Sequence, residues 1–266
     1  MTWFEALILG LVQGLTEFLP VSSSGHLAIG RELLGVGSAD DLAFEVIVHA
    51  ATVCATIVVF RKSILSLLKG LFKFKYNDET DYILKICVSM IPVFVVGMFF
   101  KDYVEGLFSS LIVVGIALLA TAALLFFSDR KSASEKKEPG RNGISYGQAF
   151  IVGCAQALAV CPGLSRSGTT IATGLLSGVK RDVVAQFSFL MVLVPILGEA
   201  FLDVIGGDFA NSSVGALPLA IGFAAAFVSG LFACKVMIAL VKKAKLKWFA
   251  LYCALVGLTV VLTQIL

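Results

Sequence analysis

Charged side chains are scarce in this chain of 266 residues, because only 15% of them are Asp, Glu, Lys or Arg, whereas 58% are hydrophobic. The mean hydropathy is +0.96. A soluble domain of this size needs far more polar surface, so the composition excludes a soluble globular protein and indicates a polytopic protein of the lipid bilayer. With a net charge of only +3, we expect no nucleic-acid partner.

Cysteine pairs are also lacking, because the six cysteines are scattered singly through apolar segments without a Cys-x-x-Cys spacing. This pattern favours small buried side chains over disulfides or a zinc site. The N-terminus lacks the basic start and the small-residue cleavage site of a signal peptide, so we expect no processing and a single membrane domain over 1–266.

Six apolar stretches are each near the roughly 20 residues that a transmembrane helix needs. They are 43–60, 83–100, 108–127, 184–205, 215–241 and 247–265. Two further apolar regions, 3–35 and 146–178, are broken in the middle by Pro, Gly and Ser residues at 19–25 and 162–170. Their halves are too short to cross, and irregular backbone at membrane depth is tolerated only inside protein or beside a cavity. We therefore predict two re-entrant helix-loop-helix hairpins.

The two broken regions are similar to each other. At a constant offset of 143, residues 6–35 and 149–178 share ten identities in thirty positions, including Gln13 with Gln156 and a Ser-x-Ser-Gly at each break. An internal duplication is the better interpretation. Three spans separate the copies, and an odd number inverts the second copy. The predicted fold is thus all-α, with about six transmembrane helices and two re-entrant hairpins related as inverted-topology repeats.

Lys and Arg gather in alternate loops, around 61–75, 130–141, 180–181 and 242–247, whereas the opposite loops hold chiefly Lys101. By the positive-inside rule, the first set is cytoplasmic, and both termini and the opening of the site face outward. The charged segment 128–145 then reads as a cytoplasmic linker between repeat units 1–127 and 146–266. The two hairpin tips should meet near the membrane midplane.

The first hairpin carries the polar side chains of a possible acid-base or nucleophilic site. Glu17 stands just before the break and His26 just after it, so the hairpin can bring carboxylate, hydroxyl and imidazole together. Gln13 lies one helical turn before Glu17, on the same face. The hydroxyls at the break are those of Ser22, Ser23 and Ser24.

Arg166 lies in the break of the second hairpin, within Pro162-Gly163-Leu164-Ser165-Arg166-Ser167-Gly168-Thr169-Thr170. A guanidinium at membrane depth costs roughly 2.5–3.5 kcal/mol on insertion scales, so it indicates a functional site. Hydroxyl donors and the backbone N–H groups of a helix that starts here suit an anion.

Other interpretations compete at single positions. A Ser at a helix break can simply satisfy freed backbone groups, which is an alternative for Ser22 and Ser24. Glu45 and His49 are one turn apart in the first full span, and for them an interfacial role or a helix–helix hydrogen bond is preferred to a catalytic one.

The motifs together resemble one family. Gln13-x-x-x-Glu17, Pro20-Val21-Ser22-Ser23-Ser24-Gly25-His26 and Pro162-Gly163-x-Ser165-Arg166-Ser167-x-x-Thr170 are similar to those of the bacterial undecaprenyl-pyrophosphate phosphatases, the bacitracin-resistance membrane family. The resemblance covers the whole chain in length and span pattern. The family has either Glu or Gln at the position of Gln13, so a mechanism with two carboxylates there is in doubt.

The resemblance implies hydrolysis of undecaprenyl pyrophosphate to undecaprenyl phosphate and phosphate in the bacterial plasma membrane, with Mg²⁺ or Ca²⁺ as cofactor. It further implies that Glu17 binds the metal or orients a base, that Ser23 and His26 are nucleophile and base, and that Arg166 is catalytic. Either Ser23 or a water activated by His26 or the metal attacks. Substrate contacts would come from Gln13, Ser22, Ser24, Ser165, Ser167 and Thr170.

A transporter or flippase of a polyprenyl phosphate lipid is the runner-up, because inverted repeats with broken helices are typical of carriers. A carrier needs Arg166 and donors, but it does not need a Ser-His-Glu group. A phosphatase of the phosphatidic-acid type fails because a second His after Ser165-Arg166 and an upstream Lys-to-Arg-Pro motif are missing. Beyond the polyprenyl pyrophosphate lipid and the bilayer, a homodimer is the one further partner that we expect.

Overall fold

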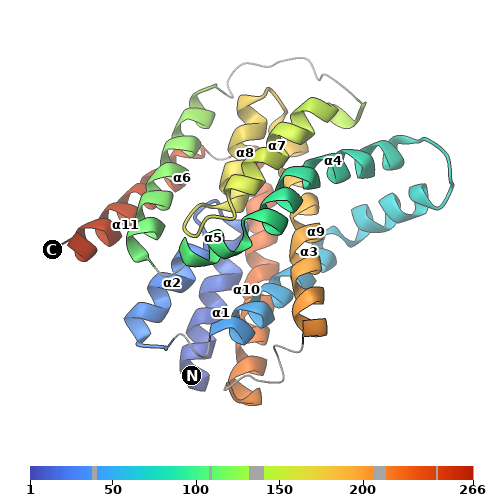
Figure 1. Cartoon of the computed structure of the whole chain (residues 1–266). Coiled ribbons are helices and arrows are strands. Elements are labelled where there is room, and N and C mark those ends of the chain that lie inside the picture. The colour runs from blue at the N-terminus through green and yellow to red at the C-terminus, as the bar shows by residue number, and fades with distance from the viewer. Residues whose placement is uncertain (38–40, 108–109, 132–140, 207–213, 244, 266) are drawn as a thin grey trace.

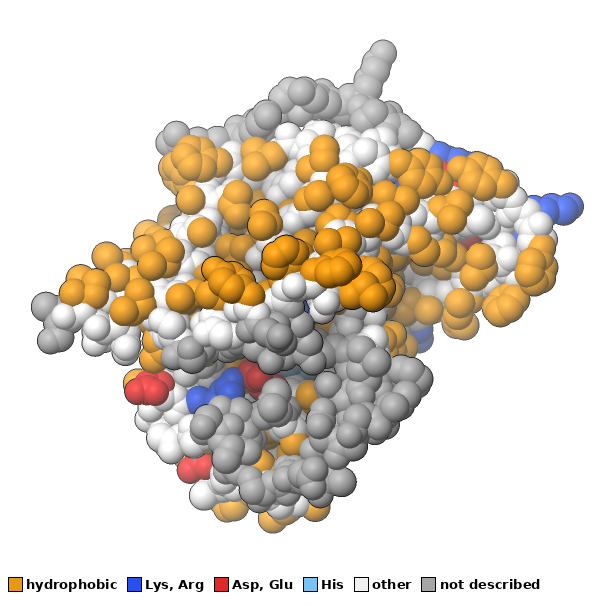
Figure 2. Space-filling view, viewed as in Figure 1, with side chains coloured by type: hydrophobic (Ala, Val, Ile, Leu, Met, Phe, Trp, Pro, Cys, Tyr) orange, Lys and Arg blue, Asp and Glu red, His pale blue; other side chains and the backbone are white. Residues whose placement is uncertain are grey.

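The computed structural model describes residues 1–37, 41–107, 110–131, 141–206, 214–243 and 245–265, and within these ranges the backbone is helical, without a β-strand. Hydrophobic side chains cover the visible helices in a broad band (Figure 2). Below this band, acidic, basic and histidine side chains appear together in a recess.

Six helices are long and apolar enough to cross a membrane, which confirms the predicted all-helical, multi-pass fold. They are α3 (Asp41–Leu71), α4 (Asp78–Phe99), α6 (Leu111–Lys131), α9 (Arg181–Gly206), α10 (Ala216–Lys243) and α11 (Lys247–Ile265).

The first of these helices is longer than the predicted span 43–60. It continues to Leu71, so Arg61, Lys62 and Lys69 lie on the helix and not in a loop. Lys and Arg are good helix formers, and their long stems can follow an apolar helix surface while the charge reaches water. The hydropathy of the segment therefore marked the apolar part of the helix and not its end.

Each broken region forms two helices around a break, as predicted. The first consists of α1 (Trp3–Phe18) and α2 (Ser23–Leu34), and the second of α7 (Tyr146–Leu158) and α8 (Arg166–Leu176). The remaining elements are the short helix α5 (Lys101–Leu107) and a 3₁₀ turn at Arg141–Gly143. The middle of the predicted linker 128–145 lies outside the described residues.

The two breaks have matching local structures at the spacing of 143 residues. Thr2 and Ser145 both close capping boxes at the starts of α1 and α7. Ser22 and Ser165 are the N-caps of α2 and α8, and their hydroxyls accept from the backbone N–H groups of Gly25 and Gly168. Each cap satisfies a donor that the helix cannot. The re-entrant course and the inverted topology remain predictions.

Helix packing brings the two pairs together from opposite ends of the bundle (Figure 1). Helix α1 lies along α10, α7 lies along α4, and α6 lies along α11. The approach is close: a side chain at Gly10 would meet the backbone of Gly222, and one at Gly153 would meet the backbone of Ser89. Small residues allow such approach where hydrophobic burial cannot drive helix association.

A buried ion pair ties the start of α4 to the segment that precedes α7. The Nζ atom of Lys85 donates to Oδ2 of Asp81 at 2.5 Å and to the backbone carbonyl of Arg141 at 2.5 Å. Asn142 and Tyr146 also donate to the carboxylate of Asp81. The side chains of Lys85 and Asp81 are only 2% and 3% exposed. The network thus holds in place the segment through which the chain enters α7.

Substituting Lys85→Met should lower the free energy of unfolding by about 3 kcal/mol, because it leaves the carboxylate of Asp81 buried without its cation. Thermal unfolding in detergent micelles measures the loss. The double substitution Asp81→Leu/Lys85→Met should recover most of it, since no charge then remains. A single variant as stable as the wild type would contradict this account.

Candidate functional site

The two helix breaks touch each other. The hydroxyl of Ser167, in the first turn of α8, donates to the carbonyl of Leu19 in the first break at 3.1 Å. A Cβ at Gly25 would lie 3.1 Å from the Cα of Gly163. The predicted meeting of the two tips is therefore present as a direct backbone contact, and the absence of a side chain at Gly25 permits it.

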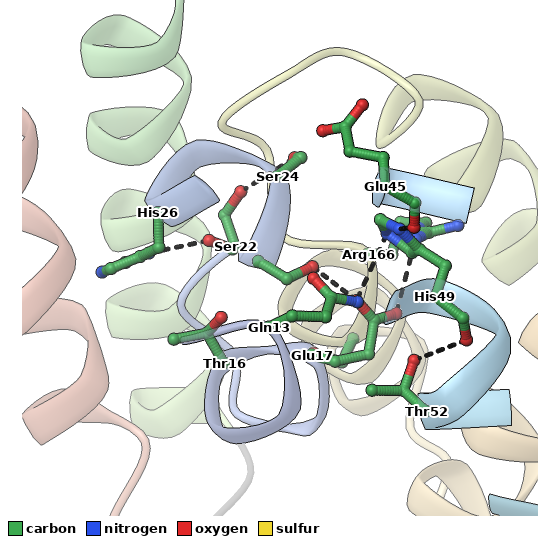
Figure 3. Close-up of polar contacts among 12 residues, drawn as sticks. Gln13, Thr16, Glu17, Ser22, Ser24, His26, Glu45, His49, Thr52 and Arg166 are labelled. Atoms are coloured by element: carbon green, nitrogen blue, oxygen red, sulfur yellow. Dashed lines mark hydrogen bonds and ion pairs between the residues drawn. The ribbon is translucent and has the colours of Figure 1, made fainter. Parts of the chain in front are cut away.

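Glu17 is the centre of the polar cluster at this contact (Figure 3). Its Oε1 lies 3.3 Å from Nη2 of Arg166. Its Oε2 accepts from the hydroxyl of Ser23 at 2.5 Å and from the amide of Gln13 at 3.0 Å. The side chain of Glu17 is 8% exposed, so these four residues form a nearly buried group. A carboxylate at such a position needs charged and hydrogen-bonding partners, and it has both.

Arg166 is the first residue of α8, directly after the N-cap Ser165. Its side chain is 23% exposed, more than that of Glu17. Among the described residues, the side chain that accepts a hydrogen bond from the guanidinium is that of Glu17. A guanidinium has five N–H groups, so one carboxylate oxygen leaves most of its donor capacity for an anion. A cavity of about 20 Å³ beside the pair has room for one water-sized molecule.

His26 does not face Ser23. Its Nδ1 lies 2.7 Å from the carbonyl oxygen of Ser22, and its Nε2 lies 2.8 Å from the hydroxyl of Tyr252 on α11. A carbonyl can only accept, so Nδ1 carries the hydrogen, and Nε2 of the neutral ring accepts from Tyr252. The two rings stack at 5.6 Å between centroids. The structure therefore separates His26 from the hydroxyl that the sequence suggested as its partner.

His49 approaches Glu17 instead, from helix α3. Its Nε2 lies 3.9 Å from Oε2 of Glu17, and its Nδ1 lies 2.8 Å from the carbonyl of Glu45. Glu45 itself pairs with Arg31 of α2. Figure 3 shows His26 and His49 on opposite sides of Glu17. The sequence favoured an interfacial role or a helix–helix hydrogen bond for His49 over a catalytic one. A spacing of 32 residues does not indicate which span lies beside the first break.

Most of the hydroxyls that were predicted to bind substrate already form hydrogen bonds with backbone groups. Ser22 and Ser165 cap helices, and Ser167 bonds Leu19 as described above. The hydroxyl of Thr170 donates to the carbonyl of Arg166 at 2.7 Å and lies 2.5 Å from that of Ser188. The hydroxyl of Ser24 lies 3.4 Å from that of Ser22. The local contacts agree with the alternative that freed backbone groups are satisfied here.

The number of acidic and histidine side chains at the site decides whether the protein alone could hold a metal ion. The described residues contain no cluster of three or more His, Cys, Asp or Glu side chains that could hold one. Glu17 is the carboxylate at the contact of the two breaks. Mg²⁺ is often held by one or two carboxylates and the oxygens of a phosphate substrate, so one carboxylate suffices only when such a substrate shares the ion.

Comparisons with known proteins point to one family. Residues 6–259 match the family model described as bacitracin resistance protein BacA. A Bacteroides thetaiotaomicron protein named undecaprenyl-diphosphatase is 57% identical over 269 residues, which cover 100% of both chains. Proteins of the same name from Parabacteroides distasonis and Carboxydothermus hydrogenoformans are 57% and 38% identical, and the matches cover 98% or more of each chain.

Inorganic pyrophosphate should stabilise this protein through Arg166. At a concentration of 100 times its Kd, a ligand raises the unfolding free energy by about 2.7 kcal/mol, which thermal unfolding in micelles detects. The variant Arg166→Leu should lose the effect, because an uncharged side chain cannot bond the anion. Arg61→Leu, at an exposed position of α3, is the matched control and should keep it. Equal stabilisation of both variants would place the anion elsewhere.

Proposed function

The chain belongs to the bacitracin resistance protein BacA family, and we propose that its Glu17–Ser23–Arg166 centre hydrolyses undecaprenyl pyrophosphate to undecaprenyl phosphate and inorganic phosphate. One observation supports this assignment above the others. A serine hydroxyl and a carboxylate from the first break and an arginine from the second break form one hydrogen-bonded group around a nearly buried carboxylate. A nucleophile, a proton acceptor and an anion-binding cation are the parts that phosphoryl transfer requires.

Arg166 binds the pyrophosphate. A guanidinium suits phosphate oxygens in a two-pronged contact, and it neutralises the charge that spreads over them in the transition state. The N-termini of α2 and α8 both lie at the contact of the breaks, so their first N–H groups add partial positive charge. The apolar helices around the site suit the undecaprenyl tail.

Ser23 is the nucleophile in this proposal, and Glu17 is its base. The hydroxyl of Ser23 already donates to Oε2 of Glu17. As Oγ of Ser23 attacks the terminal phosphorus, its proton passes to Oε2 and the bond to the bridging oxygen breaks. Undecaprenyl phosphate leaves, and the proton departs with it. Hydrolysis of phosphorylated Ser23 then releases inorganic phosphate.

His26 has a different part from the one that its place in the motif suggested. Because its Nδ1 holds the carbonyl of Ser22, it fixes the residue before Ser23. Ser22 has a φ of 70°, which is unusual for a residue other than glycine. Such backbone persists only where the surrounding contacts determine it. His26 and Tyr252 together supply these contacts at the first break.

A divalent cation, Mg²⁺ or Ca²⁺, would neutralise phosphate charge and polarise the phosphoryl oxygens when bound. Glu17 would hold it together with the substrate oxygens. Arg166 and Gln13 keep the Glu17 side chain in place in either case.

The multi-pass protein lies in the bacterial plasma membrane in this proposal, with both termini and the site opening on the outer side. The alternation of Lys and Arg along the chain supports this orientation. A homodimer remains a prediction.

Purified protein in detergent micelles should release phosphate from undecaprenyl pyrophosphate. Glu17→Gln and Arg166→Ala should each lower kcat by about 100-fold or more, because the first removes the base and the second removes a transition-state donor. Glu32→Gln and Arg61→Ala make the same changes at positions outside the cluster and should keep wild-type rates. Movement of the lipid across vesicles without phosphate release would favour a carrier and contradict the phosphatase.

Removal of divalent cations tests the cofactor. EDTA should abolish phosphate release, and added Mg²⁺ or Ca²⁺ should restore it, because the ion shares the phosphate charge with Arg166. Glu17→Asn, at any residual rate, should need a higher cation concentration for half of its maximal rate. Full activity in EDTA would remove the ion from the mechanism.

A further inference from the structure

The resting contacts of the two histidines differ at one atom, Nε2. Both rings donate Nδ1–H to the backbone carbonyl four residues earlier, so both present Nε2 as an acceptor when neutral. In His26, the hydroxyl of Tyr252 occupies this acceptor. In His49, the acceptor is directed at Oε2 of Glu17.

The separation between these two acceptors is informative. At 3.9 Å, Nε2 of His49 and Oε2 of Glu17 are too far apart for a direct hydrogen bond. One water molecule can bridge two acceptors at such a distance when both have a free lone pair. A water that donates one hydrogen to each acceptor has both hydrogens fixed, so its lone pairs point away from the two residues. That is the orientation of a water held as a nucleophile.

The two side chains differ in exposure. The side chain of His49 is 19% exposed, while that of Glu17 is 8% exposed. Of the two residues, His49 is therefore the one nearer to the surface of the protein.

We propose that His49 is a further catalytic residue: with Glu17, it holds the water that hydrolyses phosphorylated Ser23. This inference rests on the proposed phosphatase function with Ser23 as nucleophile. It assigns to α3 a part in the second chemical step, which neither hairpin motif suggests.

The hydrogen bond of Ser23 explains the order of the steps. In the resting protein, Ser23 and Gln13 both donate to Oε2 of Glu17, and an oxygen of a carboxylate has two lone pairs. Once Ser23 carries the phosphoryl group, its hydrogen is gone and one lone pair of Oε2 becomes available. The water can then be held between Oε2 and His49, next to the phosphorylated serine.

The second step balances with these groups alone. The water oxygen forms a bond to phosphorus, and the bond between phosphorus and Oγ of Ser23 breaks. One water proton passes to Oε2 of Glu17, and Oε2 returns a proton to Oγ, which lies 2.5 Å away in the resting state. Inorganic phosphate leaves with the other water hydrogen, and Ser23 regains its hydroxyl.

Three substitutions at position 49 separate this role from simple packing. His49→Gln keeps an acceptor oxygen at the end of a chain of similar length, His49→Asn withdraws it by one carbon, and His49→Leu removes it. We expect kcat to fall by about 100-fold in His49→Asn and His49→Leu, because a misplaced nucleophile costs that much. KM should fall together with kcat, so that kcat/KM, which reports the first step, stays close to wild type. His49→Gln should recover most of the rate.

Two readouts identify the step. In His49→Asn and His49→Leu, acid-quenched protein should gain the mass of one phosphoryl group on Ser23 while the first turnover of undecaprenyl phosphate persists. With methanol present, these variants should form more methyl phosphate relative to inorganic phosphate than wild type does, because water has lost its holder. Cys54→Ala, at an exposed position on another face of α3, should leave rate and ratio unchanged.

The rates and products of these variants distinguish a failure of the inference from a failure of the proposed function. Wild-type rates in His49→Leu, or equal slowing of both products with an unchanged methanol ratio and no phosphorylated Ser23, would overturn the inference. A failure of the proposed function would instead appear in the wild type, as an absence of phosphate release. His49→Asn and His49→Gln are polar and differ by one methylene, so a difference between them does not come from a failure to fold.

Discussion

The ion pair between Glu17 and Arg166 joins two segments that are 149 residues apart in the sequence, and the site depends on it. Either charge alone would have a high free-energy cost in an apolar bundle, because neither helix pair neutralises its own charge. Because the carboxylate comes from the first break and the guanidinium from the second, the cost is offset only when both tips meet. The contact that stabilises the fold is therefore the contact that assembles the site.

Close approach of the tips follows from backbone chemistry. A helix that ends inside a bundle leaves N–H and C=O groups that must be satisfied by protein. Ser22 and Ser165 cap the helices that begin there, and Ser167 reaches across to the carbonyl of Leu19. Gly25 and Gly163 let the two backbones meet without a side chain between them. Several hydroxyls that look like ligand contacts in the sequence thus satisfy backbone groups that the helix breaks leave without a partner.

The sequence predicted the number of spans, the two breaks and the residues of the centre, because these depend on local features. Hydropathy marks an apolar helix, Pro and Gly mark a break, and an unpaired Arg in an apolar segment marks a site. The partners of the histidines depend on which helices lie side by side. Tyr252 follows His26 by 226 residues, and His49 comes from a span whose rotation about its axis no local pattern fixes. The motif contains His26, yet packing gives the acceptor near Glu17 to His49.

In the proposed mechanism the second copy of the duplication supplies Arg166, the first supplies Ser23 and Glu17, and Glu17 contacts both of the other side chains. Oε1 of Glu17 lies against the arginine that is proposed to bind the anion, and Oε2 lies against the serine that is proposed to attack it. A pyrophosphate that reaches Arg166 competes with Oε1, so the guanidinium exchanges one anionic partner for another and is not left unpaired in an apolar site. Binding then releases one oxygen of Glu17 as the other begins to receive the proton of Ser23. Occupation of the anion site and activation of the nucleophile are therefore coupled through a single carboxylate.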